Sequence, residues 1–178
     1  MKTRALFLLL LPVLYLMQSC DDPKNANKYD NETSVDVMGL NFISNADEAG
    51  QAEIAAAKVA VNNSKNQQVV EFAKMMISDH TAAGEKLAKL EESELVRKQF
   101  AVNDEHKELI DTLAKLSGSD FDKAYMKFMV LSHQEAVSLF EEGGENRANR
   151  VQSFAKETLP TVEKHLESAK NILASLKQ

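Results

Sequence analysis

The stretch VVEFAKMMISDHTAAGEKLAKL, residues 69–90, carries the pattern that decides the fold. Its apolar side chains recur every three or four residues, which is the spacing of one face of an α-helix. His80 lies in the middle of that face, between Met76 and Ala83. Because burying a polar group without a partner costs about 2 kcal/mol or more, we expect the imidazole to meet a polar group from another segment.

The composition points to one compact helical domain. The chain has 178 residues, of which 44% are hydrophobic, with only 6 Gly and 3 Pro to make turns. The net charge is -6 and no basic stripe is present. We therefore expect no nucleic acid as a partner, and no electrostatic binding to an anionic membrane surface.

The same spacing predicts three more long helices. Including the helix that contains the opening stretch, the predicted ranges are 42–61, 67–92, 119–143 and 146–176. Ser119 or Asp120 is the expected N-cap of the third long helix. Pro160 interrupts the last pattern and predicts a kink or a restart there. Each of these helices has one polar group on its apolar face: Glu53, His80, His133 and His165.

Residues 93–118 connect the two halves of the chain. A short amphipathic helix over 104–116 is predicted there, ended by Ser117 and Gly118. If this segment returns the chain to its starting end, the second and third long helices run parallel. The four polar groups then lie within about 6 Å of one level, at 1.5 Å rise per residue. The sequence thus predicts an all-α four-helix bundle with a crossover segment that carries a short extra helix.

Three imidazoles and one carboxylate are a ligand set for a transition metal. Zn, Fe, Mn and Cu(II) accept such ligands, whereas Mg and Ca prefer oxygen alone. We therefore predict one transition-metal ion, of undetermined identity, bound by Glu53, His80, His133 and His165. The alternative is a structural polar network in which Glu53 pairs with imidazolium and amide groups.

Other candidate residues rank lower. Asp79 and Glu135 neighbour histidines in the sequence, but adjacent residues point apart on a helix, so they are at best supporting or surface groups. Tyr125 is predicted to be a hydrogen-bonded core residue, and His106 a solvated one. No serine, cysteine or glycine constellation predicts nucleophilic catalysis or nucleotide binding, so we name no catalytic residue.

The N-terminal residues read as an export signal. Residues 1–19 combine a basic start with an apolar run too short to span a bilayer. The only cysteine, Cys20, follows directly, and this arrangement resembles a bacterial lipoprotein cleavage site. Lipidated Cys20 would anchor the protein to a membrane. The alternative is an ordinary signal peptide with a free thiol.

Residues 20–37 lack apolar periodicity, as expected of a flexible tether, and residues 38–178 form the predicted bundle. We expect a location in the cell envelope of a bacterium. The outer membrane is the favoured anchor, and the domain stands in the periplasm or at the cell surface.

Four stretches carry a family resemblance: EAGQAEIAAAKVA (48–60), VVEFAKMMISDHTAAGEKL (69–87), LSGSDFDKAYMKFMVLSHQEAVSLFE (116–141) and FAKETLPTVEKHLESAK (154–170). Together they resemble the bacterial envelope family called domain of unknown function 4142, within the ferritin-like superfamily. The resemblance implies a ferritin-like four-helix bundle and a suspected metal site. Ile77 and Val130 stand where di-iron ferritin-like proteins have a glutamate, so ferroxidase chemistry is not carried over.

Two functions follow as hypotheses. In the first, a membrane-anchored envelope lipoprotein binds a transition metal for storage, buffering, sensing or redox protection. In the second, the bundle is a non-catalytic interaction or structural module whose buried polar network serves the fold alone. An enzyme is the less favoured hypothesis, the protein partner is unknown, and a homo-oligomer is left open.

Overall fold

The computed structural model describes residues 34–176, so the predicted signal peptide, Cys20 and most of the predicted tether lie outside the described residues. The described chain forms five helices and no β-strand. They are α1 (Val37–Asn63), α2 (Gln67–Ser93), α3 (Asp104–Ala114), α4 (Gly118–Gly143) and α5 (Asn149–Ser175). The all-helical prediction is confirmed. Within residues 34–176, no helix has both the length and the apolar character needed to cross a membrane.

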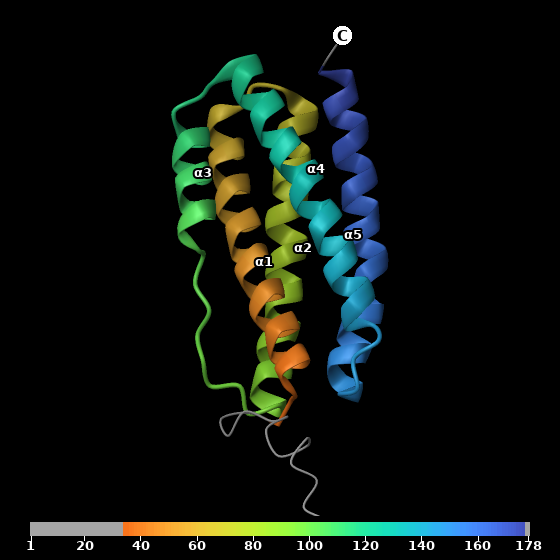
Figure 1. The fold of residues 1–178 in the computed structure, drawn as a ribbon. Helices are drawn as coiled ribbons and strands as arrows, with labels where there is room; N and C mark the ends of the chain where they lie inside the picture. Colours follow the sequence, from red (N-terminus) through yellow and green to blue (C-terminus); the bar gives the residue numbers. More distant parts are fainter. Residues whose placement is uncertain (1–33, 177–178) are drawn as a thin grey trace, which may run out of the picture.

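The four long helices form a bundle, and α3 packs on its outside against α1 (Figure 1). Helices α1 and α2 are antiparallel neighbours, and so are α4 and α5. The segment after α2 runs back along the bundle to α3, so that α4 starts at the same end as α2 and runs parallel to it. The predicted crossover, with its short extra helix, is confirmed.

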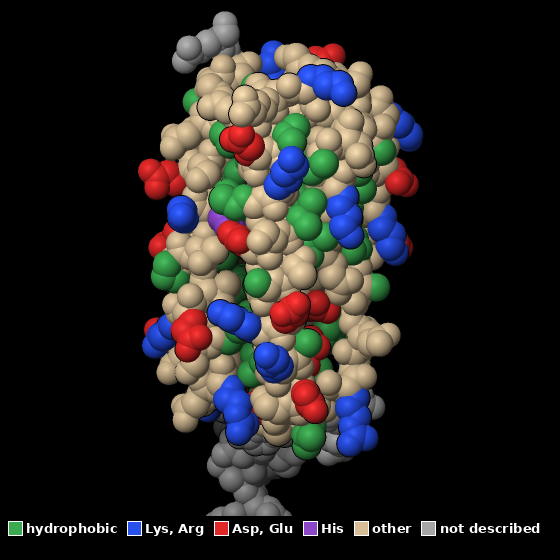
Figure 2. Space-filling view, turned by 180° about the vertical axis from the view of Figure 1, so that it is seen from behind, with side chains coloured by type: hydrophobic (Ala, Val, Ile, Leu, Met, Phe, Trp, Pro, Cys, Tyr) green, Lys and Arg blue, Asp and Glu red, His purple; other side chains and the backbone are tan. Residues whose placement is uncertain are grey.

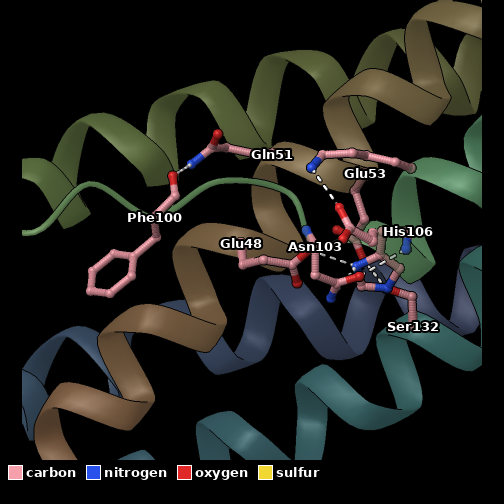
Figure 3. A network of polar contacts seen from close by, with 9 residues as sticks. Glu48, Gln51, Glu53, Phe100, Asn103, His106 and Ser132 are labelled. Carbon is pink, nitrogen blue, oxygen red and sulfur yellow. Dashed lines mark hydrogen bonds and ion pairs between the residues drawn. The ribbon is translucent and has the colours of Figure 1, made fainter.

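Side chains of α1 hold the crossover in place (Figure 3). The Gln51 amide donates to the Phe100 carbonyl at 3.0 Å, and Glu48 accepts from the Asn103 backbone N–H at 2.9 Å. Nδ1 of His106 lies 2.8 Å from Oε1 of Glu48. The prediction of a solvated His106 is wrong, because its side chain is only 22% exposed and contacts Glu48.

Several helix boundaries differ from the sequence prediction, and α1 begins five residues earlier than predicted, at Val37. Helix α5 continues through Pro160 as one helix, so the predicted restart is absent. Pro160 is exposed, and its ring lies on the solvent side of α5. Helix α4 begins at Gly118 after the N-cap Ser117, earlier than expected. Gly118 has φ 58°, a left-handed conformation that glycine adopts without strain.

The core consists of two apolar clusters, one toward each end of the bundle. The first includes Phe72, Met76, Phe121, Tyr125 and Met129. The second includes Phe42, Ile43, Leu87, Phe140 and Phe154. On every long helix, the polar residue predicted as a ligand falls between the residues of the first cluster and those of the second. The bundle therefore contains a polar layer between two apolar layers.

Candidate metal centre

The polar layer receives one side chain from each long helix: Glu53 from α1, His80 from α2, His133 from α4 and His165 from α5. Glu53, His133 and His165 are at most 2% exposed, and the His80 side chain is 14% exposed. The four groups lie far apart in the sequence, and the parallel arrangement of α2 and α4 brings them to one level.

The three imidazoles are in mutual contact. Their ring centroids lie 5.4 to 5.6 Å apart. Each ring offers one nitrogen, and these nitrogens all lie within 4.8 Å of one another. A metal with bonds of about 2.0 to 2.1 Å to nitrogen holds its ligand atoms roughly 3 to 4 Å apart. Small rotations of the rings are therefore enough to place the nitrogens around one ion.

The hydrogen bond of His133 leaves its Nε2 free as an acceptor. Nδ1 lies 3.0 Å from the carbonyl oxygen of Met129, one turn earlier on α4. Since a carbonyl only accepts, Nδ1 carries the proton and Nε2 carries the lone pair. Nε2 is buried and has no hydrogen-bond partner. This is the state in which histidine binds a metal.

His165 is oriented in the same way by a carboxylate. Its Nε2 lies 3.0 Å from Oδ2 of Asp79, on α2, and donates to it. Its Nδ1 is buried without a partner. A carboxylate behind the non-ligating nitrogen of a histidine is the usual support of a metal ligand.

Glu53 is the charged partner within the layer (Figure 3). Its Oε2 lies 2.9 Å from Nε2 of His80, and its Oε1 accepts a hydrogen bond from the Ser132 hydroxyl at 2.5 Å. Burial opposes ionisation of Glu53, but its electrostatic interactions with His80 and His133 and its hydrogen bonds with His80 and Ser132 lower its pKa to about 2. The carboxylate is therefore ionised at neutral pH.

The imidazoles divide into two kinds. Burial lowers the pKa of His133 and of His165, which keeps both rings neutral at pH 7. Burial also disfavours the charged form of His80, but the Glu53 carboxylate outweighs this effect and raises the pKa of His80. Without a metal, the layer thus holds a Glu53–His80 ion pair beside two neutral imidazoles with free lone pairs.

The sequence did not identify every polar group of the layer. Asp79 was predicted to be a supporting or surface group, and it supports His165 across the bundle, not its own neighbour His80. Ser132 was missed, because a serine on a helix carries no signal of its partner. Tyr125 is fully buried as predicted, but its hydroxyl has no hydrogen-bond partner.

The comparisons with known proteins agree with the resemblance. Residues 25–172 match the family DUF4142, a domain of unknown function. The chain belongs to this family. No curated protein matches it.

Two solved structures of another family, DUF305, share the fold. A DUF305 fragment from Deinococcus radiodurans superposes with a TM-score of 0.71 at 13% identity, over 79% of this chain and 98% of that one. A DUF305 protein from Streptomyces coelicolor, described as a "putative secreted protein", gives a TM-score of 0.67 at 12% identity, over 79% and 92%. At this level of identity the likeness establishes the fold alone.

Proposed function

We propose that this DUF4142 bundle binds one transition-metal ion through His80, His133, His165 and Glu53. The observation that carries the proposal is the pair of buried, unpartnered lone pairs on Nε2 of His133 and Nδ1 of His165. Neither nitrogen has a hydrogen-bond partner, although each ring is held in place by a hydrogen bond from its other nitrogen. A bound cation would satisfy both nitrogens.

The purely structural alternative explains less of this geometry. A buried polar network stabilises a fold when all of its members are satisfied, and an unsatisfied member costs about 1 to 3 kcal/mol. The Glu53 charge is compensated by the ion pair with His80 at 2.9 Å and by the Ser132 hydroxyl, although Nε2 of His80 makes no aligned hydrogen bond. His133 and His165 add two unsatisfied nitrogens to it, which is a net cost unless a ligand occupies the layer.

The ligand atoms limit which metals the site can bind. Imidazole nitrogens with one carboxylate suit Zn, Fe, Mn and Cu, and disfavour Mg and Ca. Metal storage, buffering, sensing and redox protection are the roles consistent with such a site. Metal binding is proposed here, and no catalytic residue is named.

The placement in the envelope forms a second part of the proposal. Residues 1–19 and Cys20 match the pattern of an exported lipoprotein, and one structural relative carries a description as a secreted protein. Mass spectrometry of the N-terminal peptide from membranes tests this. Acylated Cys20 is expected, together with release of the Cys20→Ser variant from the membrane fraction. A mature protein that begins elsewhere would contradict the anchor.

Metal titration tests the binding proposal. Protein purified without added metal and treated with chelator is titrated with Zn²⁺, Co²⁺, Mn²⁺ and Fe²⁺, the last under anaerobic conditions. One ion per chain is expected for at least one metal. His133→Ala should abolish this binding, whereas the control His106→Ala, outside the layer, should bind normally. Unchanged binding by His133→Ala, or no metal bound by the native protein, would contradict the proposal.

A further inference from the structure

A hollow with a volume of about 90 Å³ adjoins the metal centre. All four long helices line it. Glu53, His80 and His165 form part of its wall, while His133 does not. The hollow therefore meets the centre at Glu53, His80 and His165. The His80 side chain is 14% exposed, so the polar layer is not sealed from outside. Figure 2, seen from behind, shows a small area of histidine surface among hydrophobic and charged side chains.

Most of the remaining wall is small or apolar, and its other polar side chains are Asp47, Gln51, Asp79, Thr158 and Thr161. Ala83, Gly84 and Leu87 contribute from α2, and Phe140, Phe154 and Val162 from α4 and α5. The side chains offer few hydrogen bonds, so a strongly hydrated molecule would lose its water shell on entry without replacement. An apolar cavity of about 150 Å³ admits benzene, so a smaller hollow that opens outward suits a molecule of imidazole size or less.

The charges around the centre disfavour an anion. A divalent metal brings two positive charges, and Glu53 and Asp79 together bring two negative charges within the same layer. Asp47, a third acidic residue, lines the hollow itself. An incoming anion therefore gains no net attraction that would offset its loss of hydration.

From these observations we propose that the hollow gives a small, uncharged donor molecule access to an open coordination position on the metal. This inference rests on the proposed metal site and goes beyond it. Protein ligands approach from α1, α2, α4 and α5, and the hollow meets the layer between these helices. Of the other polar side chains in its wall, Asp79 is bonded to His165 and Asp47 to Gln51. In zinc proteins, a site closed by four protein ligands is structural, whereas a site with an open position exchanges an exogenous ligand.

The test uses Co²⁺ as a spectroscopic probe, because its visible absorption changes when its ligands change. Co²⁺-loaded protein is titrated with imidazole and, separately, with azide, while dialysis verifies that the metal stays bound. Imidazole is expected to shift the absorption with saturation, and azide to bind at least tenfold more weakly. If Co²⁺ binds and imidazole leaves the spectrum unchanged, the open position is refuted and the metal site stands. If azide binds as tightly as imidazole, the preference for an uncharged ligand is refuted. If the protein binds none of the metals in the titration described above, both proposals fall.

Variants that fill the hollow, together with a matched control, test whether the small molecule enters through it. An added Cβ at Gly84 meets no atom within 4 Å, so Gly84→Leu can extend a side chain without a clash. Ala83→Leu narrows the same wall one residue earlier. Ala82→Leu makes the same change on the exposed face of α2 and serves as the control. Both filling variants should keep Co²⁺ binding and weaken imidazole binding tenfold or more, and the control should leave both unchanged. Equal imidazole affinity in all three would overturn the proposed route.

Discussion

The imidazole of His165 donates a hydrogen bond from Nε2 to the Asp79 carboxylate at 3.0 Å, and this bond joins α5 to α2 across the bundle. It holds the ring with Nδ1 toward the centre of the layer and favours the tautomer that binds a metal. Asp79 itself is 40% exposed and lies outside the set of proposed ligands.

Asp79→Ala should therefore weaken metal binding while leaving the fold intact. Loss of a carboxylate behind a ligating histidine costs about 10- to 100-fold in affinity. A competition titration against a chromophoric chelator measures the dissociation constant. Glu85→Ala removes an exposed carboxylate from the same helix and should have no effect. Equal affinity of Asp79→Ala and the native protein would show that His165 is not oriented by this contact.

Metal uptake should release a proton. His80 is protonated in the metal-free protein, since Glu53 raises its pKa above 6.5, and a metal displaces that proton. Calorimetry at pH 7 in buffers of different ionisation enthalpy should therefore detect proton release on metal binding. The affinity should fall as the pH drops through the raised pKa of His80, and more steeply below 6.5, where His133 and His165 protonate as well.

Glu53→Gln provides the control for this result. Without the carboxylate, burial alone acts on His80 and lowers its pKa. The variant should then release less than half a proton at pH 7 and bind the metal more weakly. Release of a full proton from Glu53→Gln would mean that the proton comes from another group.

Periodicity was sufficient to predict the bundle, because apolar spacing records which face of each helix is buried. The crossover could be inferred as well, since only parallel α2 and α4 bring Glu53, His80, His133 and His165 to one level. The sequence did not predict where α4 begins or that α5 is continuous through Pro160. Helix α5 passes through Pro160 because the ring lies on the solvent face, and no local pattern reveals that orientation.

Only the four candidate ligands could be predicted from the sequence, and the groups that hydrogen-bond to them could not. A histidine on an apolar stripe is visible in the sequence, but its partner is set by the packing of a different helix. Ser132 illustrates the limit, since its bond to Glu53 spans 79 positions of the chain. The unpartnered nitrogens, which favour a metal over a structural network, require coordinates.

A second buried polar contact should be purely structural. Ser64, the C-cap of α1, donates its hydroxyl to the Asp122 carboxylate on α4 at 2.5 Å. Asp122→Ala removes the acceptor of the Ser64 hydroxyl proton, which leaves the hydroxyl only the bond from the Asn66 backbone N–H, and should cost about 1 to 3 kcal/mol of unfolding free energy, as measured with urea. Metal affinity should be unchanged. Asp120→Ala, exposed one half-turn away, is the control and should alter neither quantity. Weaker metal binding in Asp122→Ala would contradict the separation of the two contacts.

The Glu53–His80 pair should make the stability of the metal-free protein depend on pH in both directions. The folded pKa of Glu53 is about 2, against 4.5 for the free group, so its contribution is complete above pH 4.5 and is lost as the pH falls toward 2. The raised pKa of His80 has the opposite sign: its contribution is complete below 6.5 and is lost as the pH rises through the folded value. Both shifts describe one interaction, which is therefore strongest between pH 4.5 and 6.5.

Glu53→Gln should destabilise the metal-free protein most in that window. A shift from 4.5 to about 2 corresponds to about 3 kcal/mol at most, at 1.36 kcal/mol per pKa unit. Urea unfolding at pH 3, 5.5 and 9, with chelator present, gives the difference from the native protein at each pH. The difference should be largest at pH 5.5 and smaller at both extremes. Glu135→Gln, an exposed carboxylate on α4, should show a small difference at every pH. A pH-independent cost of Glu53→Gln would mean that the carboxylate acts through packing alone and that the ion pair adds nothing to stability.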